Sequence, residues 1–200
     1  MRILTALVVL AIFAVDVSLG SYSYYLGGSF GRTDVDTGIS ALTGTAQLDD
    51  EDTGYKLFAG VDLNEIFSVE AHYADLGESS LTGNSGDTYI LDGTLFTFTG
   101  TAGVVVGGTS FGVSALARLP IEGRIKPFAK FGVHFWDLDA AVSSTFGSAS
   151  LSDDGTDIFY GAGVEVRATD TLSARAEFER FDFGGDDVDF LSIGLIIRID

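Results

Sequence analysis

Acidic and basic side chains recur at every second position in the last third of the sequence. Within residues 158–179 one phase is apolar on both sides of the turn, and the other phase carries Glu165, Arg167, Arg175, Glu177 and Glu179. Successive side chains of a β-strand point to opposite faces, so this alternation predicts two strands joined by a short turn at 169–171. Carboxylates and guanidinium groups that share one face can pair with each other, and we therefore expect ion-pair chemistry on this face.

The sequence offers little for catalysis, with two histidines, His72 and His134, and no cysteine. Hydrolysis of a lipid or peptide needs a nucleophile and a base within hydrogen-bond reach. Neither histidine lies in a recognisable Ser/His/Glu arrangement, and we expect each to pair with a carboxylate. The acidic runs at 49–52, 153–154 and 186–187 lack the spacing of a calcium loop and are interpreted as solvated charge. We therefore predict no enzyme activity, no metal site and no cofactor.

The same alternation recurs along the rest of the chain and predicts eight strands in all. Their expected ranges are 24–32, 53–63, 67–76, 110–119, 125–138, 158–168, 172–181 and 188–199. The connections near residues 64, 120 and 170 are short, whereas most of the others are long and acidic. We interpret residues 77–108 as a hairpin extension, with two extra spanning strands as the alternative, and residues 140–155 as a loop.

The charged residues near the middle of these strands fall on a single face. They are Asp62, Glu70, Arg118, Lys130, Glu165, Arg175 and Glu177. An Arg or Lys facing lipid at the middle of a bilayer would cost about 2–4 kcal/mol, so we expect this face to close inward and the apolar face to meet lipid. The sequence therefore predicts an all-β fold, an eight-stranded antiparallel up-and-down transmembrane β-barrel. A soluble barrel with the opposite sidedness would expose the Leu, Ile, Val and Phe face to water.

The N-terminus and the overall charge restrict location and partners. A basic start precedes an apolar run at residues 3–15, which is shorter than the roughly 20 residues of a spanning helix. We predict a signal peptide at residues 1–20 and a barrel domain at 21–200, with an uncleaved membrane anchor as the alternative. The formal net charge of −18 argues against a nucleic-acid partner, because phosphates would be repelled.

Six short segments carry a resemblance to a known family. They are residues 24–31, 67–73, 115–120, 127–132, 161–165 and 172–178, which read YYLGGSFG, FSVEAHY, ALARLP, PFAKFG, GAGVE and LSARAEF. In this order and spacing they resemble the transmembrane domain of the outer-membrane protein A (OmpA) family. The resemblance implies a location in the outer membrane of a Gram-negative-type bacterium. It also implies contact with outer-membrane lipid and lipopolysaccharide, and insertion by the outer-membrane assembly machinery.

The family has an interior network of ion pairs that is proposed to gate a narrow pore. Position by position, its acids resemble Glu70 and Glu165, and its bases resemble Arg118, Lys130 and Arg175. The alternation of the strands adds Glu177 to the same face. The expected site is therefore a lumen ion-pair network and candidate gate formed by Glu70, Arg118, Lys130, Glu165, Arg175 and Glu177.

We expect a monomeric outer-membrane barrel with a structural role in envelope integrity. Two alternatives stay open from the sequence. One is a small, low-conductance, porin-like channel for ions and small solutes, because an ion-paired lumen can either fill the barrel or gate it. The other is surface adhesion through the loops at 33–52 and 77–108.

Overall fold

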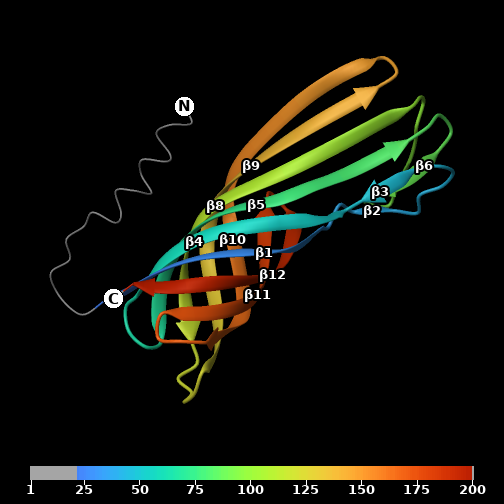
Figure 1. The fold of residues 1–200 in the computed structure, drawn as a ribbon. Helices are drawn as coiled ribbons and strands as arrows, with labels where there is room; N and C mark the ends of the chain where they lie inside the picture. The colour runs from blue at the N-terminus through green and yellow to red at the C-terminus, as the bar shows by residue number, and fades with distance from the viewer. Residues whose placement is uncertain (1–21, 200) are drawn as a thin grey trace.

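The computed structural model describes residues 22–199, so the signal peptide predicted at 1–20 lies outside the described residues. The chain in this range is built of strands (Figure 1). They are β1 (Ser23–Val35), β2 (Ile39–Ser40), β3 (Gln47–Asp49), β4 (Glu51–Asp62), β5 (Phe67–Gly83), β6 (Thr88–Leu91), β7 (Thr94–Thr97), β8 (Ala102–Arg118), β9 (Ile125–Ser144), β10 (Gly147–Arg167), β11 (Leu172–Phe183) and β12 (Asp186–Ile199). No helix within residues 22–199 is both long enough and apolar enough to cross a membrane.

The long strands form one closed antiparallel sheet. Hydrogen-bonded neighbours follow the order β5-β4-β1-β12-β11-β10-β9-β8, and β5 pairs with β8 to close the cylinder. The strands nearest the two termini, β1 and β12, lie side by side, with Tyr24 opposite Ile199 and Val35 opposite Val188. The predicted eight-stranded antiparallel up-and-down barrel is confirmed. Closure gives every barrel strand a neighbour on both sides within the cylinder, which removes the exposed edges of an open sheet.

The connections differ between the two ends of the barrel. At one end, short turns at 63–66, 119–124 and 168–171 join successive strands, as the sequence predicted. We call this the short-turn end. At the other end the chain runs through the longer segments 36–50 and 84–101, and through two-residue turns at 145–146 and 184–185. We call this the long-loop end.

The segment 77–108 extends the barrel beyond its long-loop end, as predicted. β5 and β8 remain paired through it, with a bulge between Asp75 and Glu78. Gly77 lies in this bulge with a φ of +75°, a backbone conformation that glycine adopts without strain. β6 and β7 form a small hairpin that pairs with β2 in a separate sheet, so they are not additional spanning strands.

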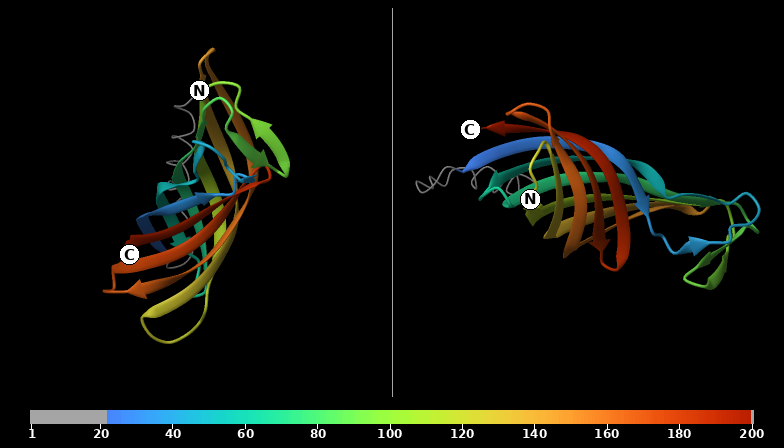
Figure 2. Two further views of the ribbon diagram at one scale, coloured as in Figure 1. Left: turned by 90° about the vertical axis from the view of Figure 1, so that its right-hand side faces the viewer. Right: turned by 90° about the horizontal axis from the view of Figure 1, so that it is seen from below.

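The loop predicted at 140–155 is wrong. β9 runs to Ser144 and β10 begins at Gly147, and the two strands pair without a register shift. Ser, Ala, Gly and Asp have a weak intrinsic preference for strands, and their abundance therefore indicated a loop. Pairing compensates for this weak preference, because β8 lies on the other side of β9 over the same length. The result is a sheet that projects beyond the barrel at the long-loop end (Figures 1 and 2).

The two faces of the barrel wall differ as the alternation predicted. Large apolar side chains of the outer face are exposed, with Leu26 at 56% and Phe30 at 61%. Residues in the other phase, including Tyr25, Lys56 and Phe58, are buried inside the cylinder. The apolar face is therefore the surface that can meet lipid, and the interior of the barrel is the core of this protein.

Candidate functional site

The barrel interior holds a continuous network of charged side chains, which we call the lumen network. Its cations are Lys56, Arg118, Lys130, Arg175 and Arg198, and its anions are Asp62, Glu70, Glu165, Glu177 and Glu179. Cations and anions are equal in number, so the network is formally neutral. Every barrel strand except β1 contributes a charge, and β1 contributes the hydroxyl of Tyr25. The network thus connects the whole circumference of the barrel.

The centre of the lumen network joins β5 to β9 and β11. Arg175 Nη1 donates a hydrogen bond to Glu70 Oε2 at 2.7 Å, and Tyr25 Oη donates to the same oxygen at 3.0 Å. Lys130 Nζ lies 2.7 Å from Glu177 Oε1 and 2.5 Å from Glu179 Oε1. These side chains come from strands on different sides of the cylinder, so their contacts hold the wall together across its interior.

Lys56 completes this central group from β4. Its Nζ donates to Glu177 Oε2 at 2.5 Å and also contacts Glu179. The side chains of Lys56, Glu70, Lys130 and Glu179 have 0% exposure. Burying an ion costs several kcal/mol unless it is paired, so at this depth each charge depends on the partners that the opposite strands supply.

The guanidinium of Arg175 is held by aromatic faces as well as by Glu70. Its Cζ lies 4.5 Å from the centroid of the Phe58 ring and 4.9 Å from that of Phe128. Its Nε and Nη2 atoms are buried and have no hydrogen-bond partner among residues 22–199. Attraction between the cation and the two rings offsets part of the cost of burying these two N–H groups.

Near the short-turn end the lumen network reaches solvent. Arg118 Nη1 donates to Asp62 Oδ1 at 2.8 Å, and Arg198 donates to Glu165 Oε1. These four residues and the side chains of the short turns line a cavity of about 580 Å³ at the mouth of the barrel. Arg175 Nη2 lies 3.8 Å from Glu165 Oε2, which connects the mouth to the central group.

Towards the long-loop end, an apolar cluster fills the interior above the lumen network. It consists of Ala74, Leu76, Trp136, Phe159, Phe181, Phe183, Val188 and Phe190, all buried, and we call it the aromatic seal. The rings of Phe159 and Phe181 are stacked with their centroids 5.2 Å apart. Lys130 Nζ lies 5.6 Å from the centroid of Phe159, so the aromatic seal rests directly on the network.

The two histidines lie against the aromatic seal and are joined by a serine. His134 Nε2 donates to the Asp182 carbonyl at 2.8 Å, because a carbonyl can only accept. In the neutral ring, Nδ1 then accepts from the Ser110 hydroxyl at 2.9 Å, and the Ser110 oxygen accepts from His72 Nε2 at 3.1 Å. The expectation that each histidine pairs with a carboxylate is wrong. Alternation predicts the face of a side chain but not the neighbours it meets across the barrel.

The structure places every residue of the predicted site inside the barrel. Glu70, Arg118, Lys130, Glu165, Arg175 and Glu177 all belong to the lumen network. Sequence reasoning left out three charged members, Lys56, Glu179 and Arg198, although each lies in the inward phase of its strand. The prediction considered only charges judged to lie near mid-strand, although Lys56 is as far inside its predicted strand as Glu70 is.

Charge outside the lumen network is distributed unevenly. Among the described residues beyond the network towards the long-loop end, acidic side chains are numerous and the bases are Arg32 and Arg180. Arg32 pairs with Glu51, and Arg180 pairs with Asp187 and Asp189. The short turns carry acids and bases in balance: Glu65, Glu122 and Asp170 with Arg124, Lys126 and Arg167. The negative charge of the chain is therefore concentrated at the long-loop end.

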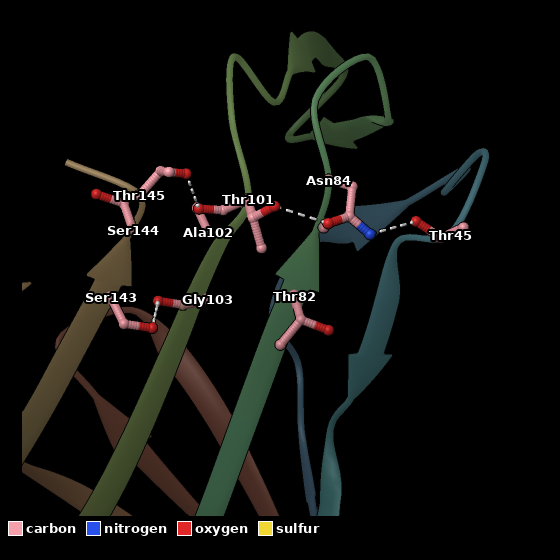
Figure 3. Close-up of a pocket in the computed structure, with 10 residues that line it drawn as sticks. Thr45, Thr82, Asn84, Thr101, Ala102, Gly103, Ser143, Ser144 and Thr145 are labelled. Atoms are coloured by element: carbon pink, nitrogen blue, oxygen red, sulfur yellow. Dashed lines mark hydrogen bonds between the residues drawn. The ribbon is translucent and has the colours of Figure 1, made fainter. Parts of the chain in front are cut away.

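A second cavity, of about 510 Å³, lies where β5 and β9 end and β8 begins, and small polar residues line it (Figure 3). Asn84 donates through its side-chain nitrogen to Thr45 Oγ1 at 2.9 Å and accepts from Thr101 Oγ1 at 2.9 Å. Beside it, Asp87 accepts from the backbone N–H of Asn84 at 2.9 Å and from the N–H of Thr45 at 3.1 Å. These bonds to the carboxylate hold the pKa of Asp87 below its ordinary value. We interpret this region as a joint that fixes two loops to each other.

No group of three or more His, Asp or Glu side chains in the described part of the chain is arranged to hold a metal ion.

A closed antiparallel barrel with an apolar outer wall and an ion-paired interior defines the class of transmembrane β-barrels. Residues 4–198 match the family described as outer membrane protein beta-barrel domain, and the chain belongs to this family. It is therefore a protein of the outer membrane of a Gram-negative-type bacterium, surrounded by outer-membrane lipid and lipopolysaccharide. In such barrels the short turns face the periplasm, so the long-loop end faces the outside of the cell.

Solved structures show the same fold. OprG of Pseudomonas aeruginosa superimposes with a TM-score of 0.57 at 13% identity, covering 88% of this chain and 95% of that one. The N-terminal β-barrel domain of OprF from the same organism gives 0.56 at 12% identity, covering 88% and 97%. Ail, the attachment invasion locus protein of Yersinia pestis, gives 0.53 at 18% identity, covering 89% and 97%. No curated protein matches the sequence.

Proposed function

We propose that the protein is a structural, non-enzymatic component of the outer membrane whose filled barrel contributes to envelope integrity and does not conduct. The observation that carries the proposal is the burial of the lumen network. The side chains of Lys56, Glu70, Lys130 and Glu179 have no exposed surface, and the aromatic seal closes the interior above them. An ion crossing such a barrel would have to displace paired charges and packed rings.

In this proposal the ion pairs of the lumen network hold the strands of the barrel together. Because its charges come from strands around the whole circumference, separating any two neighbouring strands also separates buried ion pairs. Removing one partner of a buried pair typically costs about 3–5 kcal/mol, since the other charge is left without compensation. This cost opposes opening of the cylinder, and a barrel that resists opening suits a load-bearing envelope protein.

The histidines support a non-enzymatic role. Ser110 Oγ lies 2.9 Å from His134 Nδ1, a separation at which a histidine can activate a serine. Ser110 is 1% exposed and His134 is 0% exposed, so both lie where a lipid or peptide substrate would have to displace the surrounding rings. We therefore interpret the pair as hydrogen-bonded core residues.

The test is the conductance of the protein refolded into a planar bilayer, with heat-modifiable gel migration as the check that the barrel has formed. We expect folded protein that shifts on heating and a bilayer without channel openings. Regular openings from protein that passes the gel check would overturn the proposal of a closed barrel.

The second candidate is a gated, low-conductance pore, which the cavity at the short-turn end favours. That cavity leads solvent as far as Arg118 and Glu165, so the mouth of a passage at this end is already open. Conduction would then require the contact between Glu70 and Arg175 to break and the aromatic seal to move. On this alternative, Glu70→Gln would increase the frequency of openings, whereas the closed barrel stays silent with the same substitution.

We further propose that the chain is inserted by the outer-membrane assembly machinery and acts as a monomer, because its barrel closes on itself without a second copy.

Adhesion through the loops at 33–52 and 77–108 is the third candidate. One structure of Ail holds a heparin analogue, sucrose octasulfate. That ligand is a polyanion, and the acidic long-loop end of this chain would repel it. We therefore expect the intact protein to bind heparin only at background level, and we expect deletion of these loops to leave that level unchanged.

A further inference from the structure

The sheet that projects from the external end has one unpaired edge. β10 pairs with β9 from Gly147 to Val166, but its pairing with β11 begins only at Phe159. Residues 147–158 therefore have a paired strand on one side only, although the Asp157 carboxylate accepts from the Gly184 N–H of the neighbouring turn at 3.2 Å. We call this stretch the free edge. The hairpin of β9 and β10 extends past the end of β11 in Figure 1.

The parity of the ladder identifies which backbone groups point out of the free edge. Arg167 N–H donates to the Arg124 carbonyl on the β9 side at 2.8 Å, whereas Ala168 N–H donates to the Leu172 carbonyl on the β11 side at 2.9 Å. Alternate residues of a strand direct their backbone groups to opposite sides, and β10 pairs with β9 without a register shift. The N–H and C=O groups that face away from β9 are therefore those of Ser148, Ser150, Ser152, Asp154 and Thr156. Of these, the Asp154 N–H donates to its neighbour Asp153 Oδ1 at 3.0 Å.

One face of the projecting sheet is apolar, and it continues the interior face of the barrel. Leu138 packs against the aromatic seal, which fixes the phase of this face. The apolar residues in the same phase are Leu81, Val104, Val106, Leu138, Val142 and Leu151, and we call them the inner stripe. Leu81 lies opposite Val104, and Val104 lies opposite Val142, so the stripe is continuous across strands. Leu151, beside the free edge, is 65% exposed.

The charges around the free edge indicate the kind of partner strand that could pair with it. Asp153 shares the face of the inner stripe, and Asp154 lies on the opposite face of the same strand. Proteins usually protect an exposed edge with charged side chains, Pro or a bulge, and the only such protection within residues 147–158 is acidic. Two copies pairing along this edge would bring aspartates together, and anionic lipopolysaccharide would also be repelled. A basic strand would be attracted to both faces.

We propose that the free edge and the inner stripe form a docking surface for an extended, basic segment of another polypeptide. The segment adds to β10 as a further strand, as peptides do in other sheet-edge complexes. Its alternate apolar side chains cover Leu151 and the neighbouring inner stripe. Its Lys or Arg side chains lie beside Asp153 and Asp154 as cross-strand ion pairs.

The test uses a short fluorescent peptide of alternating lysine and valine, added to the refolded protein in zwitterionic nanodiscs. We expect saturable binding by fluorescence anisotropy, together with slowed hydrogen exchange at the amides of Ser150, Ser152 and Thr156. A peptide with the same side chains but N-methylated at alternate amides cannot add to the edge and should not protect these amides. A peptide of alternating glutamate and valine should not bind.

Two matched variants separate docking from general attraction to an acidic protein. Asp153→Asn with Asp154→Asn should weaken peptide binding by roughly threefold to tenfold, as expected for the loss of two cross-strand ion pairs. Glu122→Gln with Asp170→Asn makes the same change in net charge at the periplasmic turns and should leave the affinity unchanged. The proposal is overturned if the lysine–valine peptide fails to bind, or if the two double variants weaken it equally. It is also overturned if lipopolysaccharide vesicles alone protect the same amides, because the edge would then serve a membrane.

Discussion

Arg175 and Glu70 are 105 positions apart in the sequence, yet Nη1 of the first donates to Oε2 of the second at 2.7 Å at the centre of the barrel. The contact links β11 to β5 across the interior, and Tyr25 from β1 donates to the same carboxylate. A bond of this kind can form only once the cylinder has closed. It therefore stabilises the complete barrel and not any single hairpin.

Removing the cation from this contact should destabilise the barrel strongly. Arg175→Met leaves Glu70 buried with Tyr25 and with Lys130 at 3.4 Å, and we expect the free energy of unfolding to fall by about 3–5 kcal/mol. Denaturant unfolding in detergent micelles can be followed by the fluorescence of Trp136, the one tryptophan of the chain.

The control is Arg124→Met, which removes the same charge from an exposed turn and should change stability by less than about 0.5 kcal/mol. In the double variant Glu70→Gln with Arg175→Met, the loss should be smaller than the sum of the two single losses, because no orphaned charge remains. Strict additivity would mean that the two side chains do not stabilise each other.

Replacing Gly60 by alanine should destabilise the protein, although alanine is normally the better residue within a strand. A Cβ at this position would lie 2.2 Å from Tyr25 Cζ, so the phenol ring would have to move away from Glu70. We expect a loss of about 1–3 kcal/mol in the free energy of unfolding, typical of overpacking in a core.

Gly107→Ala is the matched control for this substitution. A Cβ there would meet nothing closer than 3.5 Å, and the residue lies in a strand of the projecting sheet. This variant should be neutral or slightly stabilising. Equal losses for the two alanine variants would show that the position of Tyr25 is not the cause.

Acid should release the loop joint that Asp87 maintains. Hydrogen bonds from the backbone N–H of Asn84, and then from Thr45, lower the pKa of Asp87 below its ordinary value of 3.8. A lowered pKa in the folded state means that the stabilising contribution is complete above 3.8 and is lost as the pH falls through the folded pKa. Hydrogen exchange at the Thr45 amide should therefore accelerate at acid pH relative to amides in the barrel wall.

Asp87→Asn tests the assignment of this pH dependence. The amide keeps an acceptor oxygen but does not titrate in this range, so the acid-dependent part of the exchange at Thr45 should disappear. An unchanged acid response in the variant would place the titrating group elsewhere.

Period-two alternation was sufficient to predict the barrel and its sidedness, because a strand in a bilayer must sort its side chains between lipid and lumen. It placed Glu70, Lys130 and Arg175 on the inward face for this reason. It did not reveal that Ser110 lies between His72 and His134, because contacts across the barrel depend on the stagger of strands that are distant in sequence.

The projecting sheet was missed for a different reason. Residues 140–155 have the composition of a loop, and their strand structure depends on pairing with β8 and with each other. Val104, Val105 and Val106 on β8 are β-branched and favour a strand, but a single strand does not indicate how far its neighbours continue beside it. Composition therefore failed where the neighbouring strand determines the structure.

The central claim is that the charges at the centre of the lumen network are paired and closed off from solvent, and its most direct test is chemical labelling of the lysines Lys56, Lys126 and Lys130. A water-soluble acylating reagent, applied to the folded protein in a bilayer and read by mass spectrometry, should modify Lys126 at the periplasmic mouth and leave Lys56 and Lys130 unmodified. After unfolding, all three should react. Modification of Lys56 or Lys130 in the folded protein at the rate of Lys126 would contradict the account.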